Sequence, residues 1–288
     1  MISRRRFVQF AAALVGGGAG VGYYTWRIEP HWVELVRRDL PVRNLPAALE
    51  GQTLVQLSDL HVGPRVDDGF LRGAFDLVHA LEPAFVALTG DFMTCKRGEQ
   101  VDHALKVMES LRPGRLGTFA VLGNHDYGWS WREVDVADRL ARGLTDQGIE
   151  VLRNRQRTVA GLTFVGLDDY WSPYFSVSEA LGGLAPDAAA VALCHNPDGA
   201  DKPGWDGYRG WILAGHTHGG QCKPPFLPPP ILPVRNPRYV AGEIDLGDGR
   251  TLYINRALGH LLQVRFNARP EITVFRLTRA AESTPGLS

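Results

Sequence analysis

Five short polar motifs in this chain carry the side chains that proteins use to bind divalent metals. In chain order they are Asp59-Leu60-His61, Gly90-Asp91, Gly123-Asn124-His125-Asp126, Cys194-His195-Asn196 and Gly215-His216-Thr217-His218. Carboxylate, amide and imidazole ligands without thiolate suit Mn, Fe or Zn, and the sequence does not choose among these metals. The pattern therefore predicts a metal centre built from separate stretches of the chain.

Each motif follows a short apolar run that is typical of a buried strand. These runs are residues 54–57, 85–88, 119–122, 190–193 and 211–213. Short apolar runs bounded by polar and glycine residues favour strands of a largely buried sheet. We therefore expect the polar groups to collect along one edge of a sheet.

The order of elements predicts an α/β protein. Residues 69–81, 101–111 and 131–147 carry apolar side chains at helical spacing, and each is followed by a β-type run. This alternation indicates a largely parallel sheet. After Trp211 the strands 239–246, 251–255 and 271–277 follow one another without helices, with a turn at 247–249. We expect them to form a second, antiparallel sheet.

Composition allows one large domain and gives no sign of a nucleic-acid partner. The 288 residues are 44% hydrophobic, which permits a well-buried core. The 31 basic and 31 acidic residues balance, and the basic ones are scattered rather than banded. No nucleic acid is therefore expected as a partner.

The N-terminal segment 1–30 is expected to be separate from the domain. Three consecutive arginines, Arg4, Arg5 and Arg6, precede an uncharged, glycine- and alanine-rich run over 10–26. This resembles a twin-arginine export signal. The alternative is a plain membrane anchor, because the run approaches the roughly 20 residues needed to span a bilayer.

Either interpretation keeps the arginines on the cytoplasmic side. The domain would then face outward from a bacterial inner membrane, in the periplasm or cell envelope. Residues 31–50 are interpreted as a connector with a first strand at 32–36, residues 51–279 as the main domain, and residues 280–288 as a tail.

The five motifs, in this order and spacing, resemble those of the calcineurin-like metallophosphoesterases over residues 53–277. The sequence around the last three motifs also resembles that of a bacterial subgroup with an N-terminal export or membrane segment. The resemblance implies a four-layer β-sandwich flanked by helices, with a binuclear metal site at the carboxyl ends of the strands. It also implies an enzyme, a metallophosphoesterase.

The resemblance implies which residues hold two divalent metal ions. Asp59, His61 and His218 would hold the first ion, Asn124, His195 and His216 the second, and Asp91 would bridge both. Two such ions can share a hydroxide and direct it at phosphorus, so that no serine or cysteine nucleophile is needed. The expected activity is hydrolysis of phosphoric esters or phosphoanhydrides.

Two further residues, His125 and Asp126, are expected to be catalytic. The resemblance places His125 where it can protonate the leaving oxygen or stabilise the developing charge. Asp126 would then orient the His125 imidazole.

The substrate is expected to be a small phosphoester or a lipid-like one, and wall polymers, nucleotides and phospholipids outside the membrane are equally open. Within the resembling subgroup a candidate is UDP-2,3-diacylglucosamine, a lipid A precursor, although an outward-facing domain argues against it. A non-catalytic scaffold with this fold would lack ligands, whereas here every ligand position is filled. A mononuclear zinc peptidase or amidase would have no reason for Asn124 and a bridging Asp91.

Two segments are candidates for shaping substrate choice. Residues 168–175 would line the mouth of the pocket or pack on their own domain. The proline-rich residues 223–237 would form a stiff apolar rim that touches a membrane, or would pack against the sandwich. The three cysteines, Cys95, Cys194 and Cys222, are interpreted as small apolar fillers; an exported chain would alternatively permit a Cys194–Cys222 disulfide.

Overall fold

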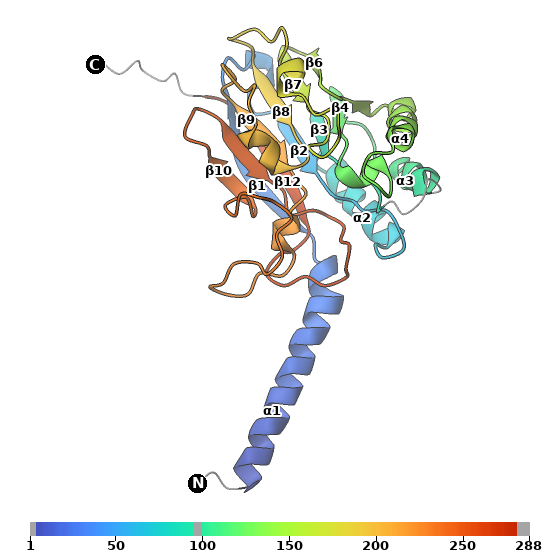
Figure 1. Cartoon of the computed structure of the whole chain (residues 1–288), viewed down its shortest axis with the longest axis vertical. Helices are drawn as coiled ribbons and strands as arrows, with labels where there is room; N and C mark the ends of the chain where they lie inside the picture. The colour runs from blue at the N-terminus through green and yellow to red at the C-terminus, as the bar shows by residue number, and fades with distance from the viewer. Residues whose placement is uncertain (1–3, 95–99, 281–288) are drawn as a thin grey trace, which may run out of the picture.

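Two six-stranded sheets lie face to face in the computed structural model, which describes residues 4–94 and 100–280 (Figure 1). The first sheet has the order β1-β12-β2-β3-β4-β5 and the second the order β10-β11-β9-β8-β7-β6. The strands of the first sheet are β1 (Glu34–Val42), β2 (Thr53–Leu57), β3 (Phe85–Thr89), β4 (Gly117–Val121), β5 (Glu150–Val151) and β12 (Glu271–Arg279). Those of the second are β6 (Arg155–Val159), β7 (Leu162–Gly166), β8 (Ala190–Leu193), β9 (Trp211–Ala214), β10 (Gly242–Asp245) and β11 (Thr251–Ile254).

The strands that precede the polar motifs run parallel to one another within each sheet. In the first sheet β2, β3 and β4 pair in parallel, and in the second sheet β7, β8, β9 and β11 do so. Parallel neighbours end at the same edge of a sheet, so the loops that leave them start side by side. Each sheet therefore presents a row of strand ends to one edge of the sandwich.

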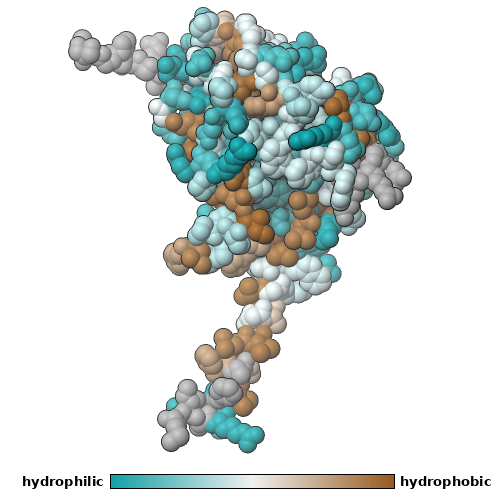
Figure 2. Space-filling view, in the orientation of Figure 1, coloured by the Kyte–Doolittle hydropathy of each residue, from teal (hydrophilic) through white to brown (hydrophobic). Residues whose placement is uncertain are grey.

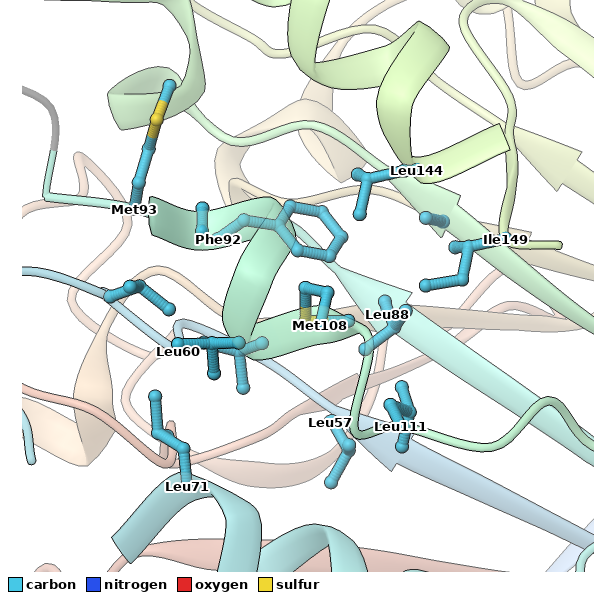
Figure 3. Packing of buried hydrophobic residues seen from close by; sticks show 14 of the residues in the cluster. Leu57, Leu60, Leu71, Leu88, Phe92, Met93, Met108, Leu111, Leu144 and Ile149 are labelled. Carbon is cyan, nitrogen blue, oxygen red and sulfur yellow. The ribbon is translucent and has the colours of Figure 1, made fainter. Parts of the chain in front are cut away.

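Three helices cover the outer face of the first sheet: α2 (Asp68–His79), α3 (Gln100–Met108) and α4 (Val134–Asp146). Each turns its apolar side inward, and the Asp67 carboxylate accepts the Phe70 backbone N–H at 2.8 Å at the start of α2. Figure 3 shows the resulting layer, in which Leu57 and Leu88 of the sheet pack with Met108 and Leu144 of the helices.

A second apolar layer fills the space between the sheets. Phe85 and Phe119 of the first sheet meet Phe164 of the second, with ring centroids 5.1 and 4.3 Å from it. The outer face of the second sheet is covered by the short helix α5 (Val177–Ala180) and by loops, including a 3₁₀ turn at Pro197–Asp201. The four-layer αββα sandwich that the motifs implied is therefore present, with a thin fourth layer.

The expectation of an antiparallel second sheet after Trp211 is wrong. Strand β12 crosses to the first sheet, where it lies parallel to β1 and antiparallel to β2. Strand β11 joins β9 in parallel, and only the β10–β11 pair is antiparallel among the strands that follow Trp211 in the second sheet. The apolar pattern marked these segments as strands but carried no information on their partners.

Two element boundaries also differ from expectation. The helix expected over 131–147 begins only at Val134, because residues 128–133 form a turn after the third motif. The first strand expected over 32–36 is the longer β1, whose nine residues all pair with β12. Residues 34–42 of the expected connector therefore belong to the first sheet.

The N-terminal helix α1 (Arg4–Tyr23) extends away from the sandwich (Figure 1). Within residues 4–94 and 100–280, no helix combines the length and the apolar character needed to cross a membrane. A π-helical turn at Tyr24–Ile28 and a 3₁₀ turn at Glu29–His31 follow α1 and rest on the domain. Glu29 is buried and accepts the Ala268 backbone N–H at 2.7 Å, so the packed fold begins before residue 31.

Candidate metal centre

The predicted ligands meet at the edge where the parallel strands end. Two compact groups form there, Asp59 with His61 and His218, and Asp91 with His195 and His216, each with its ligand atoms within 4.8 Å of one another. All of these residues are buried, and none exposes more than 6% of its total surface. Both sheets contribute to both groups, so the centre joins the two halves of the sandwich.

In the first group, two imidazoles and a carboxylate converge. The Nε2 atoms of His61 and His218 lie 3.0 Å apart, and His218 Nε2 lies 3.2 Å from Asp59 Oδ1. The other carboxylate oxygen of Asp59 accepts the Ser58 hydroxyl at 2.5 Å. Asp59 is therefore held in place, while the Nδ1 atoms of His61 and His218 have no hydrogen-bond partner in the described part of the chain.

In the second group, backbone carbonyls fix both imidazoles. His195 Nδ1 donates to the Thr89 carbonyl at 2.7 Å, and His216 Nε2 donates to the Pro233 carbonyl at 3.0 Å. A carbonyl only accepts, so these bonds define the tautomers and leave His195 Nε2 and His216 Nδ1 with free lone pairs. These two atoms face each other at 3.2 Å. Such outer hydrogen bonds orient metal-binding histidines.

The Asp91 carboxylate lies between the two groups. Its Oδ2 atom is 3.5 Å from His61 Nε2 and 3.4 Å from His195 Nε2. Its Oδ1 atom accepts the His125 backbone N–H at 3.0 Å. One oxygen is therefore anchored by the backbone and the other faces ligands of both groups, as a bridging carboxylate requires.

The backbone is strained at most of these positions. Positive φ angles occur at Asp59 (52°), His61 (49°), Asp91 (56°), His216 (70°) and His218 (53°). Residues other than glycine avoid this region because Cβ meets the backbone, and such residues cluster at functional sites. The hydrogen bonds and packing of the surrounding loops must therefore offset the strain.

Two motif glycines allow the loops to approach closely. A Cβ on Gly123 would overlap the Asp91 carboxylate, and a Cβ on Gly215 would overlap the side chains of Ser58 and Asp59. Only glycine fits at either point. The glycines of the third and fifth motifs are therefore needed for the approach of neighbouring loops.

The electrostatics of the centre favour a positive charge at its middle. Burial alone would raise the pKa of Asp59, but His218 and His195 hold it below its usual range; in Asp91 the effect of His195 likewise outweighs burial and lowers the pKa. Burial lowers the pKa of His61 well below its usual value and that of His216 to about 3. At His195 burial also acts to lower the pKa, but the nearby Asp91 outweighs it and raises the pKa. A metal ion would take the place of the His195 proton, because metals bind ionised carboxylates and neutral imidazoles.

The geometry fits two divalent cations. The Nε2 atoms of His61 and His218 lie 3.0 Å apart, so that one ion at a nitrogen–metal distance of about 2.1 Å would reach both. Asn124 is buried, and its Oδ1 atom has no hydrogen-bond partner among the described residues. An orphaned buried carbonyl oxygen is costly unless a cation or water meets it. Asn124 therefore suits the role of a ligand.

His125 and Asp126 occupy different environments. His125 is partly exposed, and its ring centroid lies 5.1 Å from that of His61 at an interplanar angle of 83°. Asp126 is fully buried; its Oδ2 accepts the backbone N–H groups of Asp91 and Gly123 at 2.9 and 2.8 Å, and its Oδ1 accepts that of Phe92 at 2.9 Å. Burial, followed by the nearby Asp91, raises the pKa of Asp126.

The expected orienting contact from Asp126 to the His125 imidazole is therefore corrected. The Asp126 carboxylate ties the loop after β3 to the loop after β4 through backbone amides. A carboxylate that accepts several amide hydrogens is satisfied without a side-chain partner. Asp126 thus positions the backbone that carries Asp91.

Two tryptophans lie beside the centre, and of the two only Trp131 falls outside the segments that the sequence analysis marked. Trp171, in the segment 168–175, lies edge-on to His216 with ring centroids 4.8 Å apart. Trp131 stacks on Trp171 at 4.9 Å and 17° and lies 6.0 Å from His125. The segment 168–175 does border the centre, as one of its two interpretations expected. The run of aromatic residues after the third motif was the available signal for Trp131.

A fully buried arginine, Arg265, stabilises the backbone next to the first group. Its guanidinium donates to the Arg256, Ala268 and Gly259 carbonyls at 2.9, 2.7 and 2.6 Å. The Gly259 backbone N–H in turn donates to the Asp59 carbonyl at 2.8 Å. Burial lowers the pKa of Arg265 to about 10, so it remains charged near neutral pH. Nothing in the local sequence indicated this role.

The proline-rich segment 223–237 and the cysteines also have defined places. Pro233 contacts His216, while Phe226, Leu227 and Ile231 are exposed, and their contact with lipid stays a prediction. Figure 2 shows apolar surface near the base of α1 (Figure 2). Cys194 and Cys222 are both free, so the alternative of a disulfide between them is not realised. Cys95 lies outside the described residues.

Comparison with known proteins agrees with this site. Residues 53–220 match the family model described as calcineurin-like phosphoesterase. The chain is 33% identical to "Phosphodiesterase YaeI" of Escherichia coli, covering 96% of this chain and 100% of that protein. It is 30% identical to "Uncharacterized metallophosphoesterase YkuE" of Bacillus subtilis, covering 96% and 98%. It is 27% identical to "UDP-2,3-diacylglucosamine pyrophosphatase LpxG" of Chlamydia muridarum, covering 88% and 92%.

Proposed function

Because the chain belongs to the calcineurin-like phosphoesterase family, and is a hydrolase of phosphoesters, we propose that it cleaves phosphodiesters with the help of two divalent cations. One observation carries this proposal. Asp59, His61 and His218 converge beside Asp91, His195 and His216, with Asp91 Oδ2 facing both groups. Two adjacent cation sites that share a carboxylate are the arrangement used for in-line displacement at phosphorus.

The residues of the chain divide the work. The two groups and Asn124 would hold the cations, which when bound supply Lewis acidity and an acidified water. His125 stands beside the first group and is partly exposed, so its imidazole can meet the oxygen that leaves phosphorus. We assign to His125 the role of general acid, which donates a proton to this leaving oxygen. Asp126 and Arg265 hold the backbone that carries the ligands.

A phosphodiester is the first candidate substrate because the relative called a phosphodiesterase aligns over its whole length. UDP-2,3-diacylglucosamine is the second candidate, because a relative named for that pyrophosphatase activity aligns over 92% of its length. Both substrates present a disubstituted phosphorus to the centre. They differ in whether an ester or an anhydride bond breaks.

A substrate comparison on the metal-reconstituted protein tests the proposal. We expect faster hydrolysis of bis(p-nitrophenyl) phosphate than of p-nitrophenyl phosphate, with UDP-2,3-diacylglucosamine as the third substrate. His125→Ala is the matched variant, and we expect its turnover to fall by about 10²–10⁴-fold because a proton donor is lost. Undiminished turnover by His125→Ala would refute the role of His125 as proton donor. Faster hydrolysis of the monoester would refute the proposed phosphodiesterase activity.

Metal content separates this proposal from the rival functions. Two equivalents of divalent metal per chain are expected, since both ligand groups are complete. One equivalent would indicate a mononuclear hydrolase such as a zinc peptidase, and none would indicate a binding scaffold. Mn, Fe and Zn should each be offered to the apoprotein, because oxygen and imidazole ligands accept all three.

We also propose that the N-terminal arginines direct export of the folded domain to the outer side of the inner membrane. Arg4, Arg5 and Arg6 stand exposed at the start of α1, which extends away from the domain and leaves them accessible. The test fuses residues 1–30 to a reporter and measures its export. Arg5→Lys with Arg6→Lys should abolish export by the twin-arginine route, whereas Arg27→Lys should not. Export unaffected by the double change would refute the proposal.

A further inference from the structure

The turn after the third motif holds an aromatic side chain in a strained conformation. Trp131 has φ of 59°, although it is a bulky residue. The turn is closed by backbone bonds from Trp131 N–H to the Gly128 carbonyl at 3.3 Å and from Glu133 N–H to the Tyr127 carbonyl at 2.8 Å. A large side chain in the left-handed region is an outlier that points to function.

A second loop brings Trp171 to the same place. The Asp169 carboxylate, fully buried, accepts the Trp171 backbone N–H at 2.7 Å and sets the direction of this loop after β7. The two indoles stack with centroids 4.9 Å apart, and their edges meet His125 on one side and His216 on the other. The stack therefore spans the candidate proton donor and a candidate metal ligand.

The stack is open to solvent rather than closed into the core. Trp131, Trp171, Ser130 and Arg132 line a cavity of about 430 Å³, and Trp131 keeps 41% of its surface exposed. Arg132 is exposed. Trp171 is partly buried, so the stack has one side on the domain and one side in solvent. The volume is within the range of small-ligand pockets.

We propose that Trp131 and Trp171 form a stacking platform for the aromatic base of a nucleoside phosphodiester whose phosphorus lies at the metal centre. This inference rests on the phosphodiesterase function proposed above and narrows its substrate class. Flat aromatic rings stack well on indole, and a guanidinium such as that of Arg132 binds phosphate oxygens or base edges. A nucleotide offers both a base and a phosphate within the reach of this cavity.

A pair of substrates that differ only in the base tests the platform. The methyl ester of adenosine 5′-phosphate and the methyl ester of ribose 5-phosphate carry the same scissile diester. We expect the metal-loaded protein to favour the adenosine ester in kcat/KM, mainly through KM. Trp131→Leu should reduce this preference about tenfold and leave the metal content at two equivalents.

The matched control is Trp129→Leu, because Trp129 is 69% exposed and makes no ring contact in the described structure. Its preference should equal that of the unaltered protein. Equal preference in Trp131→Leu, or no preference in the unaltered protein, would overturn the platform.

Binding without turnover keeps the platform testable if the proposed chemistry or the variant fails. Calorimetry compares adenosine 5′-phosphate with ribose 5-phosphate on the unaltered, metal-loaded protein, and we expect the nucleotide to bind about tenfold more tightly. If neither ester is hydrolysed but the nucleotide binds more tightly, the proposed phosphodiesterase function is refuted and the stacking platform is supported. Equal affinity for the two phosphates would refute the stacking platform and leave the proposed phosphodiesterase function unaffected.

Discussion

The two ligand groups of the metal centre differ in how their imidazoles are held. In the second group, His195 and His216 each donate a ring N–H to a backbone carbonyl, at 2.7 and 3.0 Å. In the first group, the Nδ1 atoms of His61 and His218 have no such acceptor among the described residues. The first group is instead anchored through its carboxylate, since Asp59 accepts the Ser58 hydroxyl and the His216 backbone N–H.

Two groups with similar ligands therefore need not bind metal with equal affinity. An imidazole fixed by an outer hydrogen bond loses less rotational freedom when it binds a metal, and its free nitrogen is a better electron donor. Such hydrogen bonds typically raise the metal affinity by about 10–100-fold. We therefore expect the second group to be the tighter site and the first group to exchange its ion more readily. Asp91, which faces both groups, couples the two sites.

Removal of both ions should have the largest effect. Chelation is expected to reduce phosphodiester hydrolysis to background and to lower the melting temperature by about 10 °C, because ligand-bound protein is stabilised by mass action and the buried carboxylates lose their partners. Far-UV circular dichroism should stay unchanged, since the sheets pack around three apolar layers away from the centre. Activity that persists after full chelation would disprove a metal-dependent enzyme.

The two ions should leave at different chelator concentrations. Titration of the apoprotein with Mn or Zn should show two binding phases that differ about 10–100-fold in affinity. His216→Ala should remove the tight phase, and the matched change His61→Ala should remove the weak one. Equal affinities, or the reverse assignment, would contradict the comparison between the groups.

Much of the edge that carries the centre could be predicted from the sequence. The polar motifs follow strands at 53–57, 85–89, 117–121, 190–193 and 211–214, and parallel strands end together, so convergence of the ligands followed from local pattern alone. The sheet to which β12 belongs could not be predicted in this way. Its alternating apolar residues fit either sheet, and only the packed sandwich decides that it lies between β1 and β2.

The supporting contacts of the centre were beyond sequence reasoning for a related reason. Asp126 binds backbone amides of a loop 33–35 residues away, and Trp131 meets Trp171 across two loops. Backbone donors have no sequence signature, and stacking between distant loops depends on where the sheets place them. The tight ligand groups follow from residue type; the residues that hold them follow from the tertiary fold.

Asp126→Asn should weaken both ions, by about 10-fold each. The carboxylate accepts hydrogen bonds from four backbone N–H groups. In asparagine an NH₂ group replaces one oxygen, and this group cannot accept a hydrogen bond from the N–H groups that it faces. Because these donors include the Asp91 backbone and Asp91 faces both groups, the two phases should shift together. Loss of only one phase, measured by the same titration, would show that Asp126 serves a single group.

Ser58→Ala should have the smallest effect and should act on the first group alone. The hydroxyl donates to Asp59 Oδ2 at 2.5 Å, and its removal takes one of the hydrogen bonds that anchor this carboxylate. A hydrogen bond to a charged group contributes about 1.5–3 kcal/mol, and the His216 backbone N–H remains to compensate in part, so we expect a loss of about threefold to tenfold in the weak phase. Thr145→Ala is the control, because its hydroxyl donates to the Ala141 carbonyl within α4 at 2.8 Å. An equal loss in the tight phase would contradict this prediction and would mean that Asp59 also anchors the second group, through the His216 backbone.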